Sequence, residues 1–275
     1  MSSSPYDKLY VYQIKGTLGP EEEQALGPHF LGNWVEDDFS FLFFTESSKE
    51  IVDQLVAKLP YLEFLGDYEF TYEDWHGGEL TPIEIGQFLI VPPWYSEEIK
   101  GDKTKVILDP GVVFGNGLHP TTRDCLMALE WLCQRAPVDT VLDLGTGSGI
   151  LSIAAALKGA KKVMAVDLNP LCVKTAMRNV MLNSVEGIVE IVEGNVLDYL
   201  FARTTLAIAN IHYDVVKTLV EREEFLNRPW IILSGLMRTQ WLDVRARLEY
   251  AGLRISKEWD HEMTWFTILC ENLEG

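Results

Sequence analysis

The chain has 275 residues, of which 47% are hydrophobic and 23% are charged, so it can bury a sizeable core and wholesale disorder is excluded. Its formal net charge of −18, from 23 Lys and Arg residues against 41 Asp and Glu residues, disfavours a nucleic-acid-binding surface, because neutralising phosphates requires clustered cations. At roughly 150 residues per domain, the length predicts two units, one of them smaller.

The first 75 residues are predicted to form a small α+β domain. Apolar and aromatic runs indicate strands at 9–15, 39–44 and 68–72, and helical spacing or a proline start indicates helices at 20–26 and 49–59. The order strand, helix, strand, strand, helix, strand is that of a ferredoxin-like module. Residues 76–104 are punctuated by glycine and proline and predict a linker region, with a short strand at 88–91.

Residues 105–275 change to a regular alternation of strands and helices. We predict strands at 140–144, 163–166, 189–193, 206–209 and 230–233, and helices at 121–134, 150–157, 170–183, 213–224 and 239–250. Such alternation implies a mostly parallel, doubly wound α/β sheet. The last two predicted strands, at 253–259 and 264–270, are adjacent and predict an antiparallel edge.

The four cysteines, at 125, 133, 172 and 270, form no Cys-x-x-Cys pair, so neither a disulfide framework nor a metal site is expected. The first residues lack a basic start followed by an apolar run, and no apolar stretch approaches the 18 or so residues that span a bilayer. We expect a cytoplasmic monomer that makes no contact with a membrane.

A glycine-rich turn joins the strand at 140–144 to the helix at 150–157. In the segment DLGTGSG, residues 143–149, alternate glycines allow a sharp turn and let a ligand approach without a Cβ in the way. The spacing of Gly145, Gly147 and Gly149 differs from the G-x-G-x-x-G of dinucleotide-binding folds. With Asp143 just ahead, it resembles the turn of S-adenosylmethionine-dependent methyltransferases. A plain strand-to-helix turn is the alternative.

Two polar residues follow neighbouring predicted strands. Asp167 ends the strand after the glycine turn, where a carboxylate can accept hydrogen bonds from both hydroxyls of a ribose. Asn210 ends a later strand and should face the same crevice, since ligands bind outside the carboxyl ends of the strands in open α/β sheets. Its position resembles the Asn-Pro-Pro-Tyr motif of amide and base methyltransferases, although Ile211 and His212 replace the prolines. The alternatives are a surface Asp and an Asn that caps the helix starting at Tyr213.

The segment LDPGVVFGNGLHPTT, residues 108–122, is a second glycine-rich loop and enters the helix at 121–134. It closely resembles the D-P-G-x-x-F-G-T-G-x-H-x-T-T signature of the PrmA-type ribosomal-protein lysine methyltransferases, and the resemblance covers nearly the whole chain. It implies a Rossmann-like class I methyltransferase sheet in residues 105–275, preceded by a substrate-recognition domain in residues 1–75. It further implies methyl transfer from S-adenosylmethionine to lysine or N-terminal amino groups of large-subunit ribosomal protein L11.

The resemblance also implies the site residues. The expected cofactor contacts are Thr122, Gly145, Gly147, Asp167, Asn210 and, from the loop over the donor methyl, Phe114. Asn210 is the expected catalytic residue, orienting the acceptor amine or the amino-acid end of the donor. His119 and His212 are the candidates for a general base, but a loop or capping role suits each better, and no base is assigned.

The chain departs from the family pattern at two places besides the residues after Asn210. Asn116 replaces the usual Thr of the loop, and the segment at 76–81 is less basic than its counterpart. Three alternatives therefore stay open: a lysine methyltransferase acting on another protein, a cofactor-binding module without catalysis, and a nicotinamide-dependent oxidoreductase, which the glycine spacing argues against. The acidic chain suits a basic protein partner, such as a ribosomal protein, rather than nucleic acid.

Overall fold

The computed structural model describes residues 4–98 and 101–273, and the chain divides into two compact units. The first consists of the residues up to Thr81 together with Trp94–Glu97 and Asn169–Leu171, and the second consists of the rest. Among the described residues, no helix is long and apolar enough to cross a membrane. The role of the first unit in recognising a substrate, and that of residues 76–104 as a linker, stay predictions.

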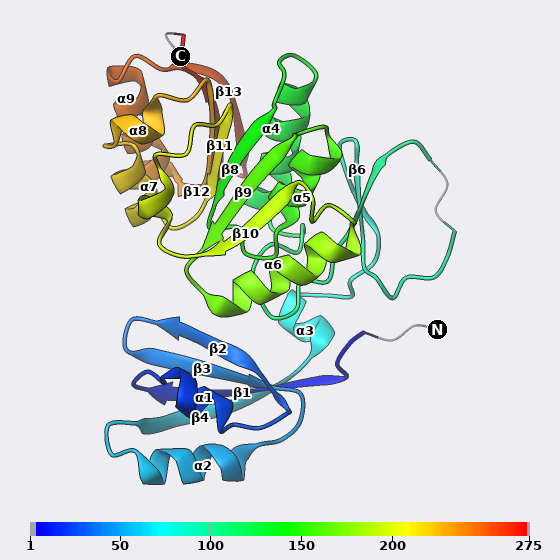
Figure 1. Cartoon of the computed structure of the whole chain (residues 1–275), viewed down its shortest axis with the longest axis vertical. Coiled ribbons are helices and arrows are strands. Elements are labelled where there is room, and N and C mark those ends of the chain that lie inside the picture. Colours follow the sequence, from blue (N-terminus) through cyan, green and yellow to red (C-terminus); the bar gives the residue numbers. More distant parts are fainter. Residues whose placement is uncertain (1–3, 99–100, 274–275) are drawn as a thin grey trace. The chain divides into compact units, whose positions relative to one another are not determined.

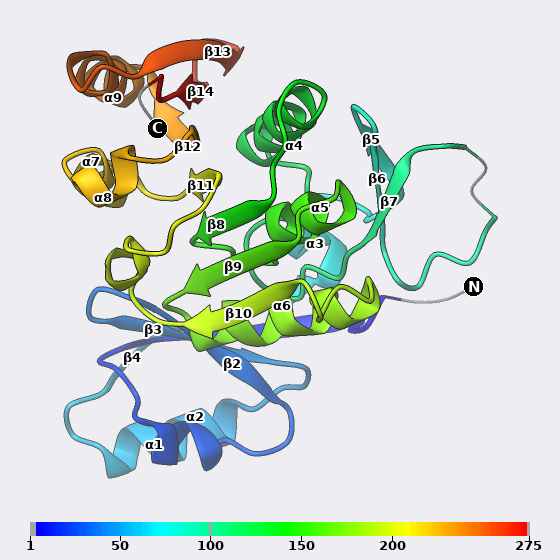
Figure 2. The ribbon, with the colours of Figure 1, turned by 45° about the horizontal axis from the view of Figure 1, so that its top comes forward.

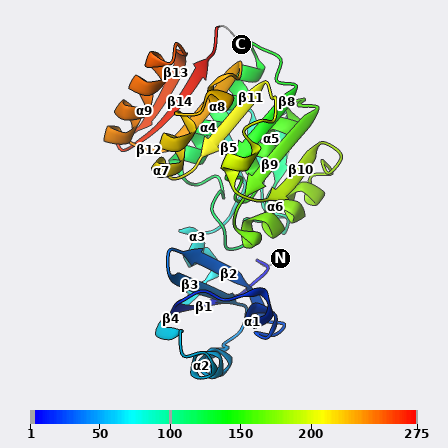
Figure 3. The same cartoon turned by 60° about the vertical axis from the view of Figure 1, so that its left-hand side comes forward.

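The first unit has the predicted ferredoxin-like order. Its elements are β1 (Lys8–Lys15), α1 (Pro20–Gln24), β2 (Phe30–Glu36), β3 (Phe39–Phe44), α2 (Lys49–Lys58), β4 (Glu63–Thr71) and α3 (Tyr72–His76). The antiparallel sheet has the order β2-β3-β1-β4, and α1 and α2 cover the same face (Figures 2 and 3). No range was predicted for β2, because Gly32 and Asn33, which are uncommon in strands, interrupt its apolar run where the pairing register shifts.

The core of the first unit lies between this sheet and its helices. Tyr12 and Ile14 of β1 point the same way because side chains two apart share one face of a strand, and both are buried with Phe44 of β3. Val52 and Leu55 of α2, three residues apart on one helical face, complete the contact. The spacing of apolar residues along β1 and α2 therefore accounts for this packing.

The second unit is built on a seven-stranded sheet of order β10-β9-β8-β11-β12-β14-β13 (Figure 1). The strands are β8 (Thr140–Leu144), β9 (Lys162–Asp167), β10 (Val189–Glu193), β11 (Leu206–Asn210), β12 (Trp230–Met237), β13 (Arg254–His261) and β14 (Trp265–Glu271). The first five in spatial order are parallel, whereas β14 is antiparallel to both β12 and β13. The predicted Rossmann-like sheet with an antiparallel end is confirmed. The final strand inserts beside β12 and leaves β13 at the edge.

Helices cover both faces of this sheet (Figure 1). They are α4 (Pro120–Cys133), α5 (Ile150–Leu157), α6 (Pro170–Leu182), the short 3₁₀ helix η1 (Val196–Tyr199), α7 (Tyr213–Leu219), α8 (Glu223–Leu226) and α9 (Arg238–Tyr250). Side chains of α4, α5 and α6 share one apolar core, and those of α7, α8 and α9 share the other. The single helix predicted at 213–224 is instead two, and the break lets Phe225 reach the core, where it is fully buried.

A three-stranded sheet precedes α4 in the second unit. It consists of β5 (Ile83–Ile85), β6 (Phe88–Val91) and β7 (Thr104–Ile107), with β5 antiparallel and β7 parallel to β6. The short strand predicted at 88–91 is present. Phe88 and Val106 are fully buried and join the same core as α4 and α5.

Candidate functional site

The turn between β8 and α5 passes through three glycines in the left-handed backbone region, Gly145 (φ +77°), Gly147 (φ +56°) and Gly149 (φ +83°). Residues with a Cβ are strained in that region. A Cβ on Gly147 would also lie 2.8 Å from the carbonyl oxygen of Phe114. Glycine is required at this position both by the backbone angle and by the close approach of the loop that contains Phe114.

Asp143 supports the turn from inside. Its buried Oδ2 accepts hydrogen bonds from the hydroxyls of Thr146, at 2.7 Å, and Ser152, at 2.6 Å. Burial raises the pKa of this carboxyl to about 6, although the two hydroxyl donors act in the opposite direction. Asp143 therefore fixes the shape of the turn from beneath.

Asp167 lies at the end of β9, beside the turn. The backbone amide of Gly147 donates a hydrogen bond to its Oδ2 at 2.9 Å. The parallel pairing of β8 with β9 brings the two residues close, because it places Leu144, the last residue of β8, opposite Val166, the last residue but one of β9. Two of the residues predicted to contact one ligand are thus brought together at the carboxyl edge of the sheet.

The loop between β7 and α4 lies over the same turn. The backbone amide of Ser148 donates to the carbonyl of Phe114 at 3.1 Å, and its hydroxyl donates to the carbonyl of Gly115 at 2.6 Å. The Phe114 side chain remains 48% exposed. Asn116 accepts a hydrogen bond from the amide of Leu118 at 2.9 Å, an Asx-type turn that gives this departure from the family's Thr a local role.

His119 caps α4. Its Nδ1 accepts from the amide of Thr121 at 3.4 Å and lies 2.8 Å from the Thr121 hydroxyl, while its ring packs edge-on against Phe114 and Trp265. Burial, and then the nearby His261, lower its pKa. The ring is therefore uncharged at neutral pH, and its capping contact occupies Nδ1. Sequence reasoning missed Trp265, which comes from β14 and has no motif around it.

The side chains of Thr122 and Asn210 carry polar groups that a ligand could bind. In the described part of the chain, the buried Thr122 hydroxyl has no hydrogen-bond partner, and no hydrogen bond is made by the side chain of Asn210. An unsatisfied buried hydroxyl costs about 1–3 kcal/mol, so a ligand that bonds it would bind more tightly. The Thr122 hydroxyl and the close approach at Gly147 are compatible with a polar ligand beside the glycine turn.

The strand pairing places Asn210 near the start of α4. Its neighbour across the parallel pairing is Ser234 of β12, whose hydroxyl donates to the Thr121 carbonyl at 3.4 Å. Gly235 (φ +80°) follows, and a Cβ there would lie 3.3 Å from Oδ1 of Asn210. The fold therefore brings the first turn of α4 against the end of β11 and keeps space around the Asn210 carboxamide.

The residues after Asn210 have structural contacts. A side chain on Gly145 would meet Ile211 at 2.7 Å, so Ile211 packs on the glycine turn. The Tyr213 hydroxyl donates to Asp243 of α9 at 2.8 Å, and this hydrogen bond raises the pKa of Tyr213. His212 is exposed at the N-cap of α7 and makes no side-chain capping bond.

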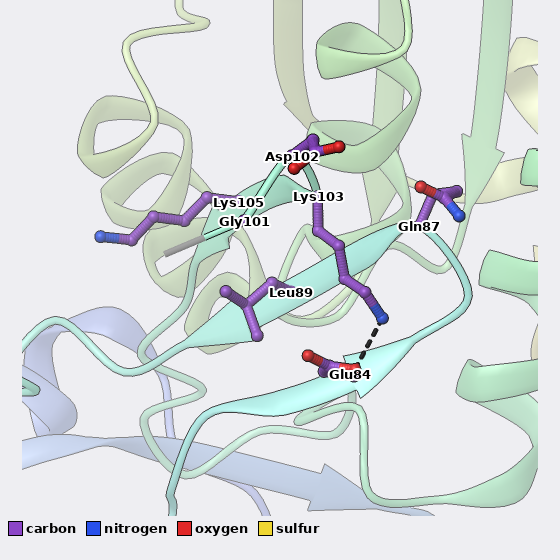
Figure 4. Close-up of a pocket in the computed structure, with 7 residues that line it drawn as sticks. All are labelled: Glu84, Gln87, Leu89, Gly101, Asp102, Lys103 and Lys105. Atoms are coloured by element: carbon purple, nitrogen blue, oxygen red, sulfur yellow. Dashed lines mark hydrogen bonds and ion pairs between the residues drawn. The ribbon is translucent and has the colours of Figure 1, made fainter. Parts of the chain in front are cut away.

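A separate hollow of about 400 Å³ lies on the three-stranded sheet (Figure 4). Its Lys103 points to Glu84, 2.7 Å away, and also donates to the Gly86 carbonyl, so this cation ties β5 to the start of β7. None of the predicted cofactor residues lines this hollow. Across the described residues, no group of three or more His, Cys, Asp or Glu side chains could hold a metal ion.

Residues 47–272 match the family model described as ribosomal protein L11 methyltransferase (PrmA). A ribosomal protein L11 methyltransferase of Staphylococcus epidermidis is 34% identical over an alignment that covers 100% of this chain and 88% of that protein. One from Anoxybacillus flavithermus is 41% identical over 181 residues, 64% of this chain. That match spans only 57% of the Anoxybacillus protein.

A solved structure with the same kind of description is also similar. The ribosomal protein L11 methylase from Lactobacillus delbrueckii subsp. bulgaricus superposes with a TM-score of 0.61 at 29% sequence identity. The superposition covers 70% of this chain and 98% of that one.

Proposed function

The chain belongs to the ribosomal protein L11 methyltransferase (PrmA) family, and on this premise we propose that it transfers methyl groups from S-adenosylmethionine to lysine or N-terminal amino groups of ribosomal protein L11. The observation that carries the proposal is the buried Thr122 hydroxyl, which has no hydrogen-bond partner among the described residues, together with the glycine turn whose Gly147 amide holds Asp167. A binding site, rather than a structural turn, accounts for all of these features together.

We expect residues of the glycine turn and of the loop between β7 and α4 to contact different parts of the cofactor. Asp167 would accept hydrogen bonds from the ribose hydroxyls, and the close backbone of Gly145 and Gly147 would admit the ligand without side chains. Thr122 would bond a polar group of the cofactor, and Phe114 would cover it from the loop. The bound cofactor supplies a methyl group on a sulfonium that can leave to a nucleophile.

The chain's contribution to the reaction is placement of the acceptor. A free lysine has a pKa of about 10.4 and is mostly protonated at neutral pH, but a dry pocket lowers that pKa and favours the neutral amine. We assign Asn210 the task of orienting this amine. Alignment of the reacting atoms can supply on the order of 7–11 kcal/mol of the barrier. The uncharged His119 ring, with Trp265 and Phe114, provides apolar walls and adds no positive charge near the site.

The proposed substrate agrees with the charge of the chain. With a formal net charge of −18, the protein attracts a basic partner such as a ribosomal protein and repels nucleic acid. We propose that it acts as a cytoplasmic monomer, because its substrate is cytoplasmic and Asn210, Asp167 and Thr122 all come from one chain. Neither nucleic acid nor a membrane takes part in this reaction.

Two measurements test the proposal. Calorimetry with S-adenosylmethionine and with NAD should show binding of the first alone, and binding of NAD alone would make the chain an oxidoreductase. Methyl groups from labelled S-adenosylmethionine should then appear on purified ribosomal protein L11. Labelling of a different protein in a lysate would change the substrate, and cofactor binding without any labelling would indicate a module without catalysis.

A further inference from the structure

Asn179, on α6, is fully buried and connects two separate parts of the site. Its Oδ1 accepts a hydrogen bond from the backbone amide of Asp109 at 3.0 Å. Its Nδ2 donates to the carbonyl of Asp109 at 2.9 Å and to the carbonyl of Ser148, in the glycine turn, at 2.8 Å. Both amide hydrogens and the amide oxygen of this side chain are therefore engaged.

Together with the bonds of Ser148, the hydrogen bonds of Asn179 form a closed network, here called the closed ring, around the loop that starts at Asp109. Ser148, whose carbonyl is bound by Asn179, holds the other end of the same loop segment through the carbonyls of Phe114 and Gly115. The segment from Asp109 to Gly115 is thus fixed at its start by Asn179 and at its end by Ser148, and these two residues are bonded to each other. Arg178 also holds Asp109, through an ion pair at 2.8 Å, but within the described residues it makes no bond to the glycine turn. Loss of the Asn179 side chain would therefore remove the bonds that join the start of the loop to the turn.

Asn183, one helical turn later, makes the same kind of clamp at a position that does not touch the turn. Its Oδ1 accepts from the amide of Ile107 at 2.8 Å, and its Nδ2 donates to the carbonyls of Ile107 at 2.6 Å and Asn179 at 2.8 Å. Asn183, which directly follows the last residue of α6 and is partly buried, therefore matches Asn179 in residue type and number of bonds, but in the described part of the chain it makes no hydrogen bond to Ser148 or to the loop after Asp109.

We propose that Asn179 is a positioning residue for the cofactor site, which sets the separation between the loop bearing Phe114 and the glycine turn. The inference rests on the proposed function, since it assigns that separation to binding of S-adenosylmethionine. A carboxylate cannot replace the amide, because it would direct an acceptor oxygen at the carbonyls of Asp109 and Ser148. The Asp109 carbonyl would keep only the longer bond from Arg178 at 3.4 Å, and the bond to the Ser148 carbonyl in the glycine turn would be lost.

The test compares Asn179→Asp with Asn183→Asp in the full chain. Calorimetry measures the dissociation constant for S-adenosylmethionine, thermal unfolding measures stability, and hydrogen exchange follows the amides of residues 109–117. Both variants should lose stability, but only Asn179→Asp should weaken binding, by about tenfold or more, and speed exchange in the loop. Asn183→Asp should stay within about threefold of the wild-type dissociation constant.

Equal weakening in both variants, or unchanged binding in Asn179→Asp, would overturn the inference. If Asn179→Asp does not fold, Ser148→Ala replaces it, because it removes only the hydroxyl bond to Gly115 and leaves the turn backbone intact. Faster loop exchange with weaker binding in Ser148→Ala supports the closed ring, and unchanged values refute it. If the wild-type chain does not bind S-adenosylmethionine, the proposed function is refuted. Hydrogen exchange of the loop in Asn179→Asp would still test whether Asn179 holds the loop in place.

Discussion

The backbone amide of Gly147 donates a hydrogen bond to Oδ2 of Asp167 at 2.9 Å, so the glycine turn itself holds the carboxylate predicted to bind the ribose. The two residues are 20 positions apart in sequence and lie at the ends of adjacent parallel strands, β8 and β9. A change at either residue should therefore affect the same ligand, but through different physical causes.

Asp167→Asn should weaken binding of S-adenosylmethionine while leaving the turn folded. The amide oxygen can still accept from Gly147, but the side chain loses the negative charge and the second acceptor oxygen. A hydrogen bond to a charged group contributes about 1.5–3 kcal/mol, which corresponds to about 10–100-fold in the dissociation constant. Calorimetry measures the affinity, and thermal unfolding serves as the control for folding. An affinity within about threefold of wild type would remove Asp167 from the cofactor site.

Gly147→Ala should destabilise the protein and also weaken cofactor binding. The added Cβ meets the Phe114 carbonyl at 2.8 Å and forces the loop away from the turn. Gly252→Ala is the matched control, because Gly252 also has a left-handed backbone (φ +84°) but open space where its Cβ would lie. Each variant should lose about 1–3 kcal/mol in urea unfolding from backbone strain, whereas only Gly147→Ala should bind S-adenosylmethionine more weakly. Equal affinities would show that the loop tolerates the displacement.

Sequence patterns anticipated the parts of the fold that local chemistry determines. The bounds of α5 and β10 agree with the prediction residue for residue, because glycines and alternating apolar runs mark their ends. The bounds of β2 and the break between α7 and α8 were not anticipated. In β2, Gly32 and Asn33 are tolerated because both pair with β3, and the break between α7 and α8 is set by burial of Phe225. β2 and the break between α7 and α8 both depend on tertiary contacts, which a local sequence pattern does not reveal.

The same division applies to the candidate site. Gly145, Gly147 and Asp167 could be predicted because the chemistry of a glycine turn and a strand-end carboxylate lies within short segments. Trp265 could not, because only the pairing of β14 with β12 brings it to His119. The roles of Gly145, Gly147 and Asp167 in binding a cofactor stay predictions.

Asp143→Asn should change how stability depends on pH. In the folded protein the pKa of Asp143 is raised to about 6 from an ordinary value of 3.8, mainly by burial. Because the folded pKa exceeds the unfolded one, the stabilisation from the protonated carboxyl is complete below the unfolded pKa and is lost as pH rises through about 6. Asparagine does not titrate, so the variant escapes this loss.

The free energy of unfolding of Asp143→Asn, minus that of wild type, should therefore rise by about 1–3 kcal/mol between about pH 4 and pH 6.5 and then stay level. Urea unfolding at several pH values measures it. Other titrating groups cancel in the difference, including Asp124, whose pKa burial also raises to about 6. A difference that does not vary with pH would mean that Asp143 ionises as an exposed carboxyl does.

Asn210→Ala should abolish most turnover while leaving the affinity for S-adenosylmethionine within a few-fold. The side chain of Asn210 makes no hydrogen bond within the described residues, so its removal leaves no protein group unpaired and the fold should be unaffected. If the carboxamide orients the acceptor amine, its loss should lower kcat by about 10²-fold or more, the usual effect of removing one well-placed polar group from an active site. Steady-state methylation of ribosomal protein L11 measures kcat, and calorimetry measures cofactor affinity.

His212→Ala is the control for Asn210→Ala, because His212 is two residues away, exposed, and makes no side-chain capping bond. It should leave kcat within about threefold, since methylation of a neutral amine in a dry pocket needs no base at this position. A large loss of kcat in His212→Ala would make that histidine the general base. If Asn210→Ala lowers kcat and the affinity for S-adenosylmethionine together, the carboxamide binds only the methyl donor. The residue that orients the amine would then be one of Phe114, His119 and Trp265.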